Sequence, residues 1–425
     1  MKRFCVFGLG YIGLPTACLF STHGHTVIGV DSDKRVVQEI NKGKVLFEES
    51  CLQELLKTAL AENSLVAKIE PEIADVFLIA VPTPLDKETR MADLRYVREA
   101  ANAISRYIKR GNMVILESTV PPGACEKMLL PILEESGLQG GKDFHLVHCP
   151  ERAIPGNTIH EMVHNDRIIG GIDRKSAELA RELYSSFVEG SLYLTDLRTA
   201  EIVKLMENTF RDVNIALANE FAQIGEENGM NIWEAVELAN KHPRVEILKP
   251  GPGVGGHCLA IDPWFLAENS TSSRIIAFAR EINESMPRHV LTLTMELLKG
   301  MKSVTVTVLG VAYKADVGDV RETPALKFIR LAQGEGYKVK IYDPYVKDFE
   351  YALCSLEEAA RGSDCLVLIT DHSMFKQLDP VKLSQLMRSK NLVDTRNILE
   401  HEKWREAGFE VRVLGVGAHY GYTKS

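Results

Sequence analysis

Residues 250–264 have the composition of a reactive loop. Four glycines fall within residues 251–256, so the backbone there can adopt conformations that are closed to other residues. A single thiol, Cys258, follows them. A thiolate can attack an aldehyde, and the thiohemiacetal can lose a hydride to become a thioester that water cleaves. Asp262, four residues later, could exchange protons during these steps. We therefore interpret Cys258 as a nucleophile, although most free cysteines fill protein cores.

A second group of polar residues has the spacing of one helix face. Lys204 and Asn208 are four residues apart, and Glu201 precedes the lysine by three. An amine and an amide that project together could hold a sugar hydroxyl and stabilise the oxyanion formed as a hydride leaves. The spacing alone fits an exposed helix face with an ordinary Glu-to-Lys pair equally well.

A nucleotide site is indicated at the N-terminus. Gly8, Gly10 and Gly13 directly follow an apolar run at residues 4–7, and Asp31 comes 23 residues after Gly8. In such a motif the first glycine permits a tight turn, the second lets the backbone approach a pyrophosphate, and the third lets helix pack on strand. Asp31 would accept from both ribose hydroxyls and repel a 2′-phosphate, so the sequence predicts NAD rather than NADP.

Two further loops could meet the same ligand. Residues 81–84 and 118–123 are rich in proline, and each follows a predicted strand, where loops of an open α/β sheet contact ligand. Prolines that only shape a loop, without any contact to a ligand, explain these two segments as well. The His-Cys pairs at residues 148–149 and 257–258 invite a zinc interpretation, but adjacent ligands lack the usual spacing, so we predict no metal site.

The elements that must position these residues form two similar halves, an α/β class of two Rossmann-like doubly wound domains joined by a long central helix. The predicted strands of the first half are residues 4–7, 26–30, 76–81 and 113–116, with a helix at 16–23. Those of the second half are residues 304–309, 339–342, 363–370 and 391–395. Gly310 and Asp343 repeat the arrangement of Gly8 and Asp31 with a longer insert.

The predicted domains are a NAD-binding domain at residues 1–190, a central helical dimerisation and catalytic domain at 191–297, and a second Rossmann-like domain at 298–425. Residues 198–228 carry apolar residues at helical spacing, namely Ile202, Leu205, Met206, Phe210, Val213, Leu217, Phe221 and Ile224. A helix of about 45 Å is longer than a small domain, so part of its apolar face is expected to meet a second subunit.

Composition places the chain among ordinary globular proteins. Apolar residues make up 45% and charged residues 25% of its 425 residues, and the net charge of −8 disfavours a nucleic-acid partner. No apolar run is long enough to cross a membrane and no secretory pattern opens the chain, so we expect a cytoplasmic protein. Eight irregularly spaced cysteines without a CxxC pair indicate reduced thiols.

Several of these motifs together resemble the UDP-glucose/GDP-mannose dehydrogenase family along essentially the whole chain. They are residues 8–15 (GLGYIGLP), 118–123 (STVPPG), 149–152 (CPER), 201–208 (EIVKLMEN), 219–220 (NE), 255–262 (GGHCLAID), 313–314 (YK) and 321–324 (RETP), in the family's order. The resemblance implies oxidation of a sugar C6 alcohol to a carboxylate with two NAD and one cysteine, without release of the aldehyde.

The resemblance also assigns roles, and it implies that residues 298–425 form a UDP-sugar-binding domain. It implies that Cys258 is the nucleophile, that Lys204 and Asn208 stabilise oxyanions, that Asp262 and Thr119 handle protons and ordered water, and that Glu151 assists thioester hydrolysis. The implied cofactor residues are Gly8, Gly10, Tyr11, Ile12, Gly13, Asp31, Arg35, Pro82, Thr83, Thr119 and Arg321, the last binding cofactor or closing the domains. The implied substrate residues are Glu151, Arg152, Lys204, Asn208, Arg244, Gly255, His257, Tyr313 and Lys314, with Arg244 reaching the neighbouring site of a homodimer.

The segment around the cysteine points to one branch of the family. UDP-glucose members resemble one another in having Ser before the cysteine and Lys before the aspartate, whereas this chain has His257 and Ile261. That favours a UDP-N-acetylhexosamine substrate, and residues 242–248, 251–254 and 262–265 are most similar to the manno form. UDP-N-acetylglucosamine and UDP-glucose stay open as alternatives.

Two rival interpretations remain at this point. A two-electron 3-hydroxyacid dehydrogenase also places a lysine and an asparagine on a central helix but uses no thiol. A nucleotide-sensing protein could keep the fold without turnover; the presence of Cys258, Lys204, Asn208 and Asp262 argues against it.

Overall fold

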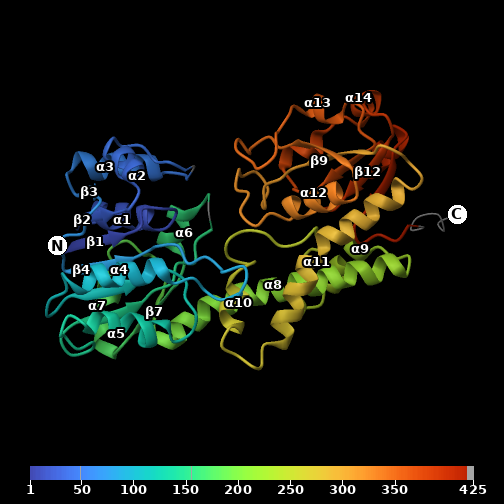
Figure 1. Ribbon diagram of the computed structural model, residues 1–425. Helices are drawn as coiled ribbons and strands as arrows, with labels where there is room; N and C mark the ends of the chain where they lie inside the picture. Colours follow the sequence, from blue (N-terminus) through green and yellow to red (C-terminus); the bar gives the residue numbers. More distant parts are fainter. Residues whose placement is uncertain (48, 155, 419–425) are drawn as a thin grey trace. The chain divides into compact units, whose positions relative to one another are not determined.

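The computed structural model describes residues 1–47, 49–154 and 156–418, which divide into two compact units (Figure 1). The N-terminal unit comprises Met1–Glu207 with Trp264–Ser270, and the C-terminal unit comprises Asn208–Pro263 with Thr271–Ser425. One boundary falls inside helix α8 (Leu197–Glu227) and another inside helix α10 (Asp262–Ala267). The separate domain at residues 191–297 remains a prediction.

The N-terminal unit is built on a sheet in the order β3-β2-β1-β4-β5-β6-β7-β8, parallel except for the antiparallel pairing of β6 with β7. Its strands are β1 (Arg3–Phe7), β2 (Thr26–Val30), β3 (Leu65–Lys68), β4 (Val76–Ile79), β5 (Met113–Leu116), β6 (His145–His148), β7 (Arg167–Gly171) and β8 (Leu192–Asp196). Its helices are α1 (Gly13–Thr22), α2 (Lys34–Asn41), α3 (Leu52–Ala61), α4 (Arg95–Ser105), a π-helical turn (Cys125–Leu129), α5 (Leu130–Glu134), α6 (Thr158–His164) and α7 (Arg174–Tyr184).

Both faces of this sheet are buried at its centre. Strand β1 sends Phe4 and Val6 into one apolar cluster and Cys5 and Phe7 into another, and all four side chains are at most 6% exposed. Continuous apolar strands are typical of a parallel sheet that helices cover on both sides. The glycines and loops at the carboxyl ends of β1, β4 and β5 therefore meet at one edge of the sheet.

The C-terminal unit repeats the plan in an all-parallel sheet ordered β10-β9-β11-β12-β13. Its strands are β9 (Thr305–Leu309), β10 (Lys338–Tyr342), β11 (Cys365–Leu368), β12 (Asn391–Asp394) and β13 (Glu410–Val413). Its helices are α9 (Ile232–Ala239), α11 (Arg274–Leu297), α12 (Pro324–Gly334), α13 (Leu356–Ala360), a 3₁₀ turn (Ser373–Gln377), α14 (Pro380–Leu386) and α15 (His401–Glu406).

The strands and the long helix predicted from sequence are confirmed. Every predicted strand is present with its ends within two residues of the prediction; the largest differences are that 76–81 ends at Ile79 and 363–370 becomes Cys365–Leu368. Helix α8 spans 31 residues, as the apolar spacing predicts. Within the described ranges, none of the helices combines the length and apolarity that a bilayer crossing requires. None of the eight cysteines, all of which lie in the described ranges, forms a disulfide, and five of them are buried.

Candidate active site

The three glycines after β1 differ in what surrounds them. Gly8 has a φ of +88°, and a Cβ there would lie 2.6 Å from Ala80 O; a Cβ on Gly13 would lie 1.9 Å from Gly8 O. Packing within the protein therefore demands these two glycines. No atom lies within 4 Å of a Cβ built on Gly10, which is exposed. The open space at Gly10 fits the close approach of a pyrophosphate.

Asp31 directly follows β2 beside this turn. Its Oδ2 accepts a hydrogen bond from Leu9 N at 3.0 Å, its Oδ1 accepts from Asp33 N at 2.9 Å, and the residue is partly exposed. The carboxylate thus keeps acceptor capacity for ribose hydroxyls. Tyr11 is 37% exposed, and its ring centroid lies 4.3 Å from that of Phe47.

The loops after β4 and β5 lie together at the same edge. Ser118 Oγ donates to Val81 O at 2.7 Å, which ties the loop of Pro82 and Thr83 to the loop of Thr119. Thr83 and Thr119 are partly exposed. A purely local role of the prolines in shaping each loop does not account for this pairing, because the hydrogen bond joins two segments that are 37 residues apart in the chain.

Glu201 has a structural task that the sequence did not suggest. It is 1% exposed and accepts from Gly123 N at 2.5 Å and from Cys125 N at 2.8 Å, so α8 fixes the end of the Thr119 loop. Burial raises the pKa of Glu201, although these two N–H groups oppose the shift. The alternative that Lys204 and Asn208 lie on an exposed helix face is wrong, because their exposed fractions are only 7% and 0%.

Glu151 lies in a buried loop after β6 in the N-terminal unit. Its Oε1 accepts from Arg152 N at 2.7 Å and Ala153 N at 2.8 Å, and its Oε2 accepts from Arg167 Nη2 at 2.8 Å. The side chain of Arg152, a predicted substrate residue, pairs with Glu207 at 2.6 Å. Sequence reasoning missed Arg167, which carries no motif of its own.

Cys258 lies in the C-terminal unit and is partly exposed. Its carbonyl oxygen accepts from Asp262 N at 2.8 Å, so one helical turn separates the thiol residue from the aspartate. Asp262 is 3% exposed and accepts a short hydrogen bond from Asn208 Nδ2. The structure therefore brings together three of the predicted catalytic residues.

The glycines before Cys258 allow close packing on a second segment. A Cβ on Gly255 would lie 2.8 Å from Tyr313 Cβ, and one on Gly256 would lie 2.9 Å from Tyr313 Cε2. Gly256 N donates to Arg321 O at 2.9 Å. The predicted residues Gly255, His257 and Tyr313 thus lie in one neighbourhood, with Lys314 exposed next to Tyr313.

Arg321 is held by a carboxylate. Its guanidinium donates to both oxygens of Asp319, with Nε to Oδ1 at 2.9 Å. Burial pushes the pKa of Asp319 upward, but the hydrogen bonds from Arg321 outweigh it, so the pKa is lowered.

A buried polar network on α8 and α11 holds the reactive loop, residues 250–264, at two points. Asn219 Oδ1 accepts from Gly251 N at 2.8 Å, and Arg280 Nη1 donates to Leu259 O at 3.4 Å. Asn283 Nδ2 and Arg280 Nη1 both donate to Asp212 Oδ1, at 2.8 and 2.6 Å. Sequence reasoning did not assign Asp212, although it lies four residues after Asn208 and therefore on the same helix face.

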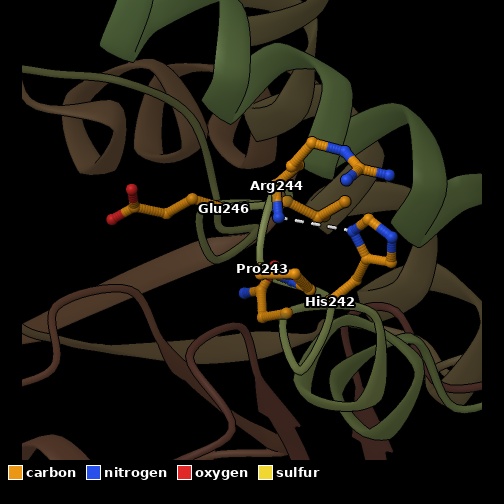
Figure 2. Close-up of a pocket in the computed structure, with 6 residues that line it drawn as sticks. His242, Pro243, Arg244 and Glu246 are labelled. Carbon is orange, nitrogen blue, oxygen red and sulfur yellow. Dashed lines mark hydrogen bonds between the residues drawn. The ribbon is translucent and has the colours of Figure 1, made fainter.

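The loop of Arg244 is firmly held while its side chain is exposed. Asn240 exchanges two hydrogen bonds with the backbone of Ile247, and Asn214 Nδ2 donates to Glu246 O at 2.8 Å. Figure 2 shows the open pocket lined by residues 240 and 242–246, where Arg244 N donates to His242 Nδ1 at 3.3 Å. Arg244 is thus presented to solvent on a rigid loop.

The predicted site residues are divided between the two units. Lys204, Thr119 and Glu151 belong to the N-terminal unit, whereas Cys258, Asn208 and Asp262 belong to the C-terminal unit. Their meeting in one active site, and the role of each, stay predictions.

Comparison with known proteins agrees with this fold and these motifs. Models of the UDP-glucose/GDP-mannose dehydrogenase family match three parts of the chain: the NAD binding domain at residues 2–188, the central domain at 198–285 and the UDP binding domain at 307–401. The chain belongs to the UDP-glucose/GDP-mannose dehydrogenase family. It is an enzyme of that family and its cofactor is NAD, as Asp31 predicts. Family membership sets aside a 3-hydroxyacid dehydrogenase and a non-enzymatic sensor.

Three relatives illustrate the similarity. The UDP-N-acetyl-D-mannosamine dehydrogenase of Methanococcus aeolicus is 49% identical over 98% of this chain and 96% of its own. The solved structure of the UDP-D-ManNAc dehydrogenase from Pyrococcus horikoshii is 44% identical with a TM-score of 0.93, covering 98% of this chain and all of that one. An NDP-N-acetyl-D-galactosaminuronic acid dehydrogenase of Ralstonia nicotianae is 44% identical over 93% of this chain and 96% of its own.

Proposed function

We propose that this enzyme oxidises the C6 alcohol of UDP-N-acetyl-D-mannosamine to the carboxylate through a thiohemiacetal and a thioester on Cys258. The partly exposed thiol, one helical turn before an Asp262 that Asn208 holds, carries the proposal. High similarity to relatives named for this substrate supports the manno configuration. UDP-N-acetylglucosamine and UDP-glucose are the alternatives.

The overall reaction removes four electrons. The alcohol and one water give the carboxylate, two hydrides and three protons, and bound NAD accepts one hydride in each of two rounds. In the first round, Lys204 and Asn208 stabilise the alkoxide from which the first hydride leaves. Cys258 Sγ then bonds to the aldehyde carbon, and the resulting thiohemiacetal loses the second hydride.

Hydrolysis completes the sequence. Water attacks the thioester carbon, Glu151 accepts its proton, and the C–S bond breaks to return the Cys258 thiolate. Asp262 and Thr119 move protons and order water. Tyr313 and Lys314 bind the nucleotide sugar, and Arg321 supports the cofactor or domain closure.

A homodimer completes the proposal. Met206 and Phe210 are four residues apart on α8, and their side chains are 54% and 64% exposed, so a second subunit would cover them together. Arg244 on its rigid loop would reach the neighbouring site. A cytoplasmic location stays part of the same prediction.

Counting NADH tests the function. UDP-N-acetylmannosamine, UDP-N-acetylglucosamine and UDP-glucose are each offered with NAD, and we expect two NADH per molecule of the manno sugar. Cys258→Ser should bind substrate yet lose carboxylate formation by about a thousandfold or more, because a hydroxyl is a far weaker nucleophile at neutral pH. Cys51→Ser, at an exposed thiol elsewhere, is the matched control. One NADH per sugar, or full activity without the thiol, contradicts the scheme.

A further inference from the structure

A buried guanidinium lies between two carboxylates in the N-terminal unit. Arg167, the first residue of β7, is 3% exposed. Its Nη2 donates to Glu151 Oε2 at 2.8 Å, and its Nη1 lies 3.9 Å from Glu117 Oε1. One positive charge therefore serves both Glu151, which the proposed function places at thioester hydrolysis, and Glu117, which has no assigned role.

Glu117 connects this pair to the helix behind the glycine turn. It directly follows β5 and is 2% exposed. Its Oε2 accepts from Thr16 Oγ1 at 3.0 Å, and its Oε1 accepts from Tyr184 Oη at 2.6 Å. Thr16 belongs to α1, whose first residue is Gly13 of the nucleotide motif. Both carboxylate oxygens thus have fixed partners.

Aromatic rings restrict the guanidinium further. The Arg167 Cζ lies 4.9 Å from the ring centroid of Tyr184 and 5.8 Å from that of Phe187. Its Nη2 also donates to Met162 O at 3.3 Å. A planar guanidinium that packs against aromatic rings and donates hydrogen bonds from its tip holds Glu151 in one orientation.

We propose that Arg167 is a positioning residue for Glu151 and that Glu117, by gaining or losing a proton, changes how strongly Arg167 holds Glu151 during thioester hydrolysis. The inference rests on the proposed function, because the role of Glu151 comes from there. Neither Arg167 nor Glu117 touches the substrate in this scheme; both act through Glu151.

Glu117 is suited to exchange a proton near neutrality. Burial raises the pKa of Glu117 to about 7, against the opposing charge of Arg167. The other titratable groups that face it are Glu151, Cys149 and Tyr184. Burial raises the pKa of Cys149 to about 12 and that of Tyr184 well above its usual value, so the thiol and the phenol keep their protons.

The direction of the effect follows from charge. When Glu117 is protonated, Arg167 and Glu151 form a neutral pair. When Glu117 ionises, the positive charge is shared between two carboxylates, so Arg167 neutralises Glu151 less completely. A less neutralised carboxylate attracts a proton of the attacking water more strongly, so hydrolysis is expected to accelerate as the pH rises through neutrality.

The decay of the acyl-enzyme tests the proposal. Single-turnover reactions with UDP-N-acetylmannosamine and NAD are quenched at intervals from pH 6 to 8.5, and intact-protein mass reports the thioester. We expect the ratio of wild-type to Glu117→Gln decay rates to grow from near one at pH 6 to about tenfold at pH 8. Tyr184→Phe keeps the ring but removes a hydrogen bond that lowers the pKa of Glu117, so its midpoint should move upward.

A second pair of variants isolates the guanidinium. Arg167→Lys keeps the charge but lacks the planar fork, so thioester should accumulate with decay about tenfold slower. Arg174→Lys, in the exposed pair of Arg174 with Glu178, should behave as wild-type. If Arg167→Lys fails to fold, the nearly isosteric variants Glu117→Gln and Tyr184→Phe still show whether Glu117 controls the rate of thioester hydrolysis.

The outcomes separate the two proposals. If Glu151→Gln accumulates thioester while Glu117→Gln and Arg167→Lys hydrolyse it at the wild-type rate at every pH, only the positioning role is overturned. If the wild-type enzyme forms no thioester from any of the three sugars, the proposed function fails, and the inference fails with it.

Discussion

The turns after the first strands of the two sheets share one construction. Gly8 follows β1 with a φ of +88°, and Gly310 follows β9 with a φ of +84°. In the N-terminal unit Leu9 N donates to Asp31 Oδ2 at 3.0 Å, and in the C-terminal unit Val311 N donates to Asp343 Oδ2 at 2.7 Å. In each case the acid directly follows the next strand and accepts a hydrogen bond from the turn.

The two carboxylates differ in what else surrounds them. Asp31 is partly exposed, and its described partners are two backbone N–H groups. Asp343 is 7% exposed, and its oxygens contact the N–H groups of Val311, Ala312, Tyr345 and Val346 and the ring of His372. Asp31 can accept ribose hydroxyls, whereas Asp343 serves the fold.

The segments after the glycines differ as well. Helix α1 begins at Gly13, directly after the turn, but α12 begins at Pro324, and the intervening segment carries Tyr313. Tyr313 packs against the glycines that precede Cys258. A glycine and an acid at matching strand ends thus indicate a Rossmann-like turn, and only the surroundings decide whether a cofactor can use it.

The largest expected difference concerns stability. Asp343→Asn should destabilise the C-terminal unit by roughly 3–5 kcal/mol, because it leaves buried donors without a carboxylate. Calorimetry should show this unit unfolding several degrees earlier, while Asp348→Asn, at an exposed aspartate nearby, should change nothing. An unchanged unfolding temperature would remove the structural role of Asp343.

Gly10 offers the next test. Gly10→Ala should leave the unfolding temperature unchanged, since a Cβ meets no atom within 4 Å, yet raise the KM for NAD by roughly ten- to a hundredfold by crowding the pyrophosphate. Gly13→Ala, which collides with Gly8 O, should instead destabilise the fold. Normal NAD binding by Gly10→Ala contradicts the assignment of this turn to the cofactor.

Asp31→Asn is expected to act more mildly. The KM for NAD should rise about tenfold and the rejection of NADP should weaken, because the carboxylate that repels a 2′-phosphate is gone. Asp33→Asn is the control, since asparagine also caps α2 well. Unchanged preference between the two cofactors would refute the ribose contact.

The smallest effect is a pH dependence. Burial pushes the pKa of Asp343 upward, but the hydrogen bonds from His372 and from backbone N–H groups outweigh it, so the pKa is lowered. The native state then binds the proton less readily than the unfolded chain, so this stabilisation is present above pH ~4 and lost as the pH falls through the lowered pKa. The difference in unfolding temperature between wild-type and Asp343→Asn should become smaller on acidification. A constant difference would show that the negative charge of Asp343 does not stabilise the fold.

Much of this architecture follows from local sequence. Apolar runs predicted β1, β2, β4 and β5 of the first sheet and β9, β10, β11 and β12 of the second, because a strand buried on two faces must be continuously apolar. Strands β3, β6, β7, β8 and β13 were not predicted. Helical spacing predicted α8, and the glycine-flanked Cys258 stood out because few other functions require that composition. The buried partners Arg167, Glu117, Asp212 and Arg280 were not predictable, since charged residues without a motif are usually exposed and their partners lie far away in the chain.

The sequence by itself determined the two α/β halves, the nucleotide turn and the identity of the thiol, because periodicity and glycine positions act over a few neighbouring residues. Only the tertiary structure decided that Asp31 is open while Asp343 is enclosed, and that one buried guanidinium joins Glu151 to Glu117. Such roles depend on burial and on donors brought in from distant strands, which no local pattern encodes.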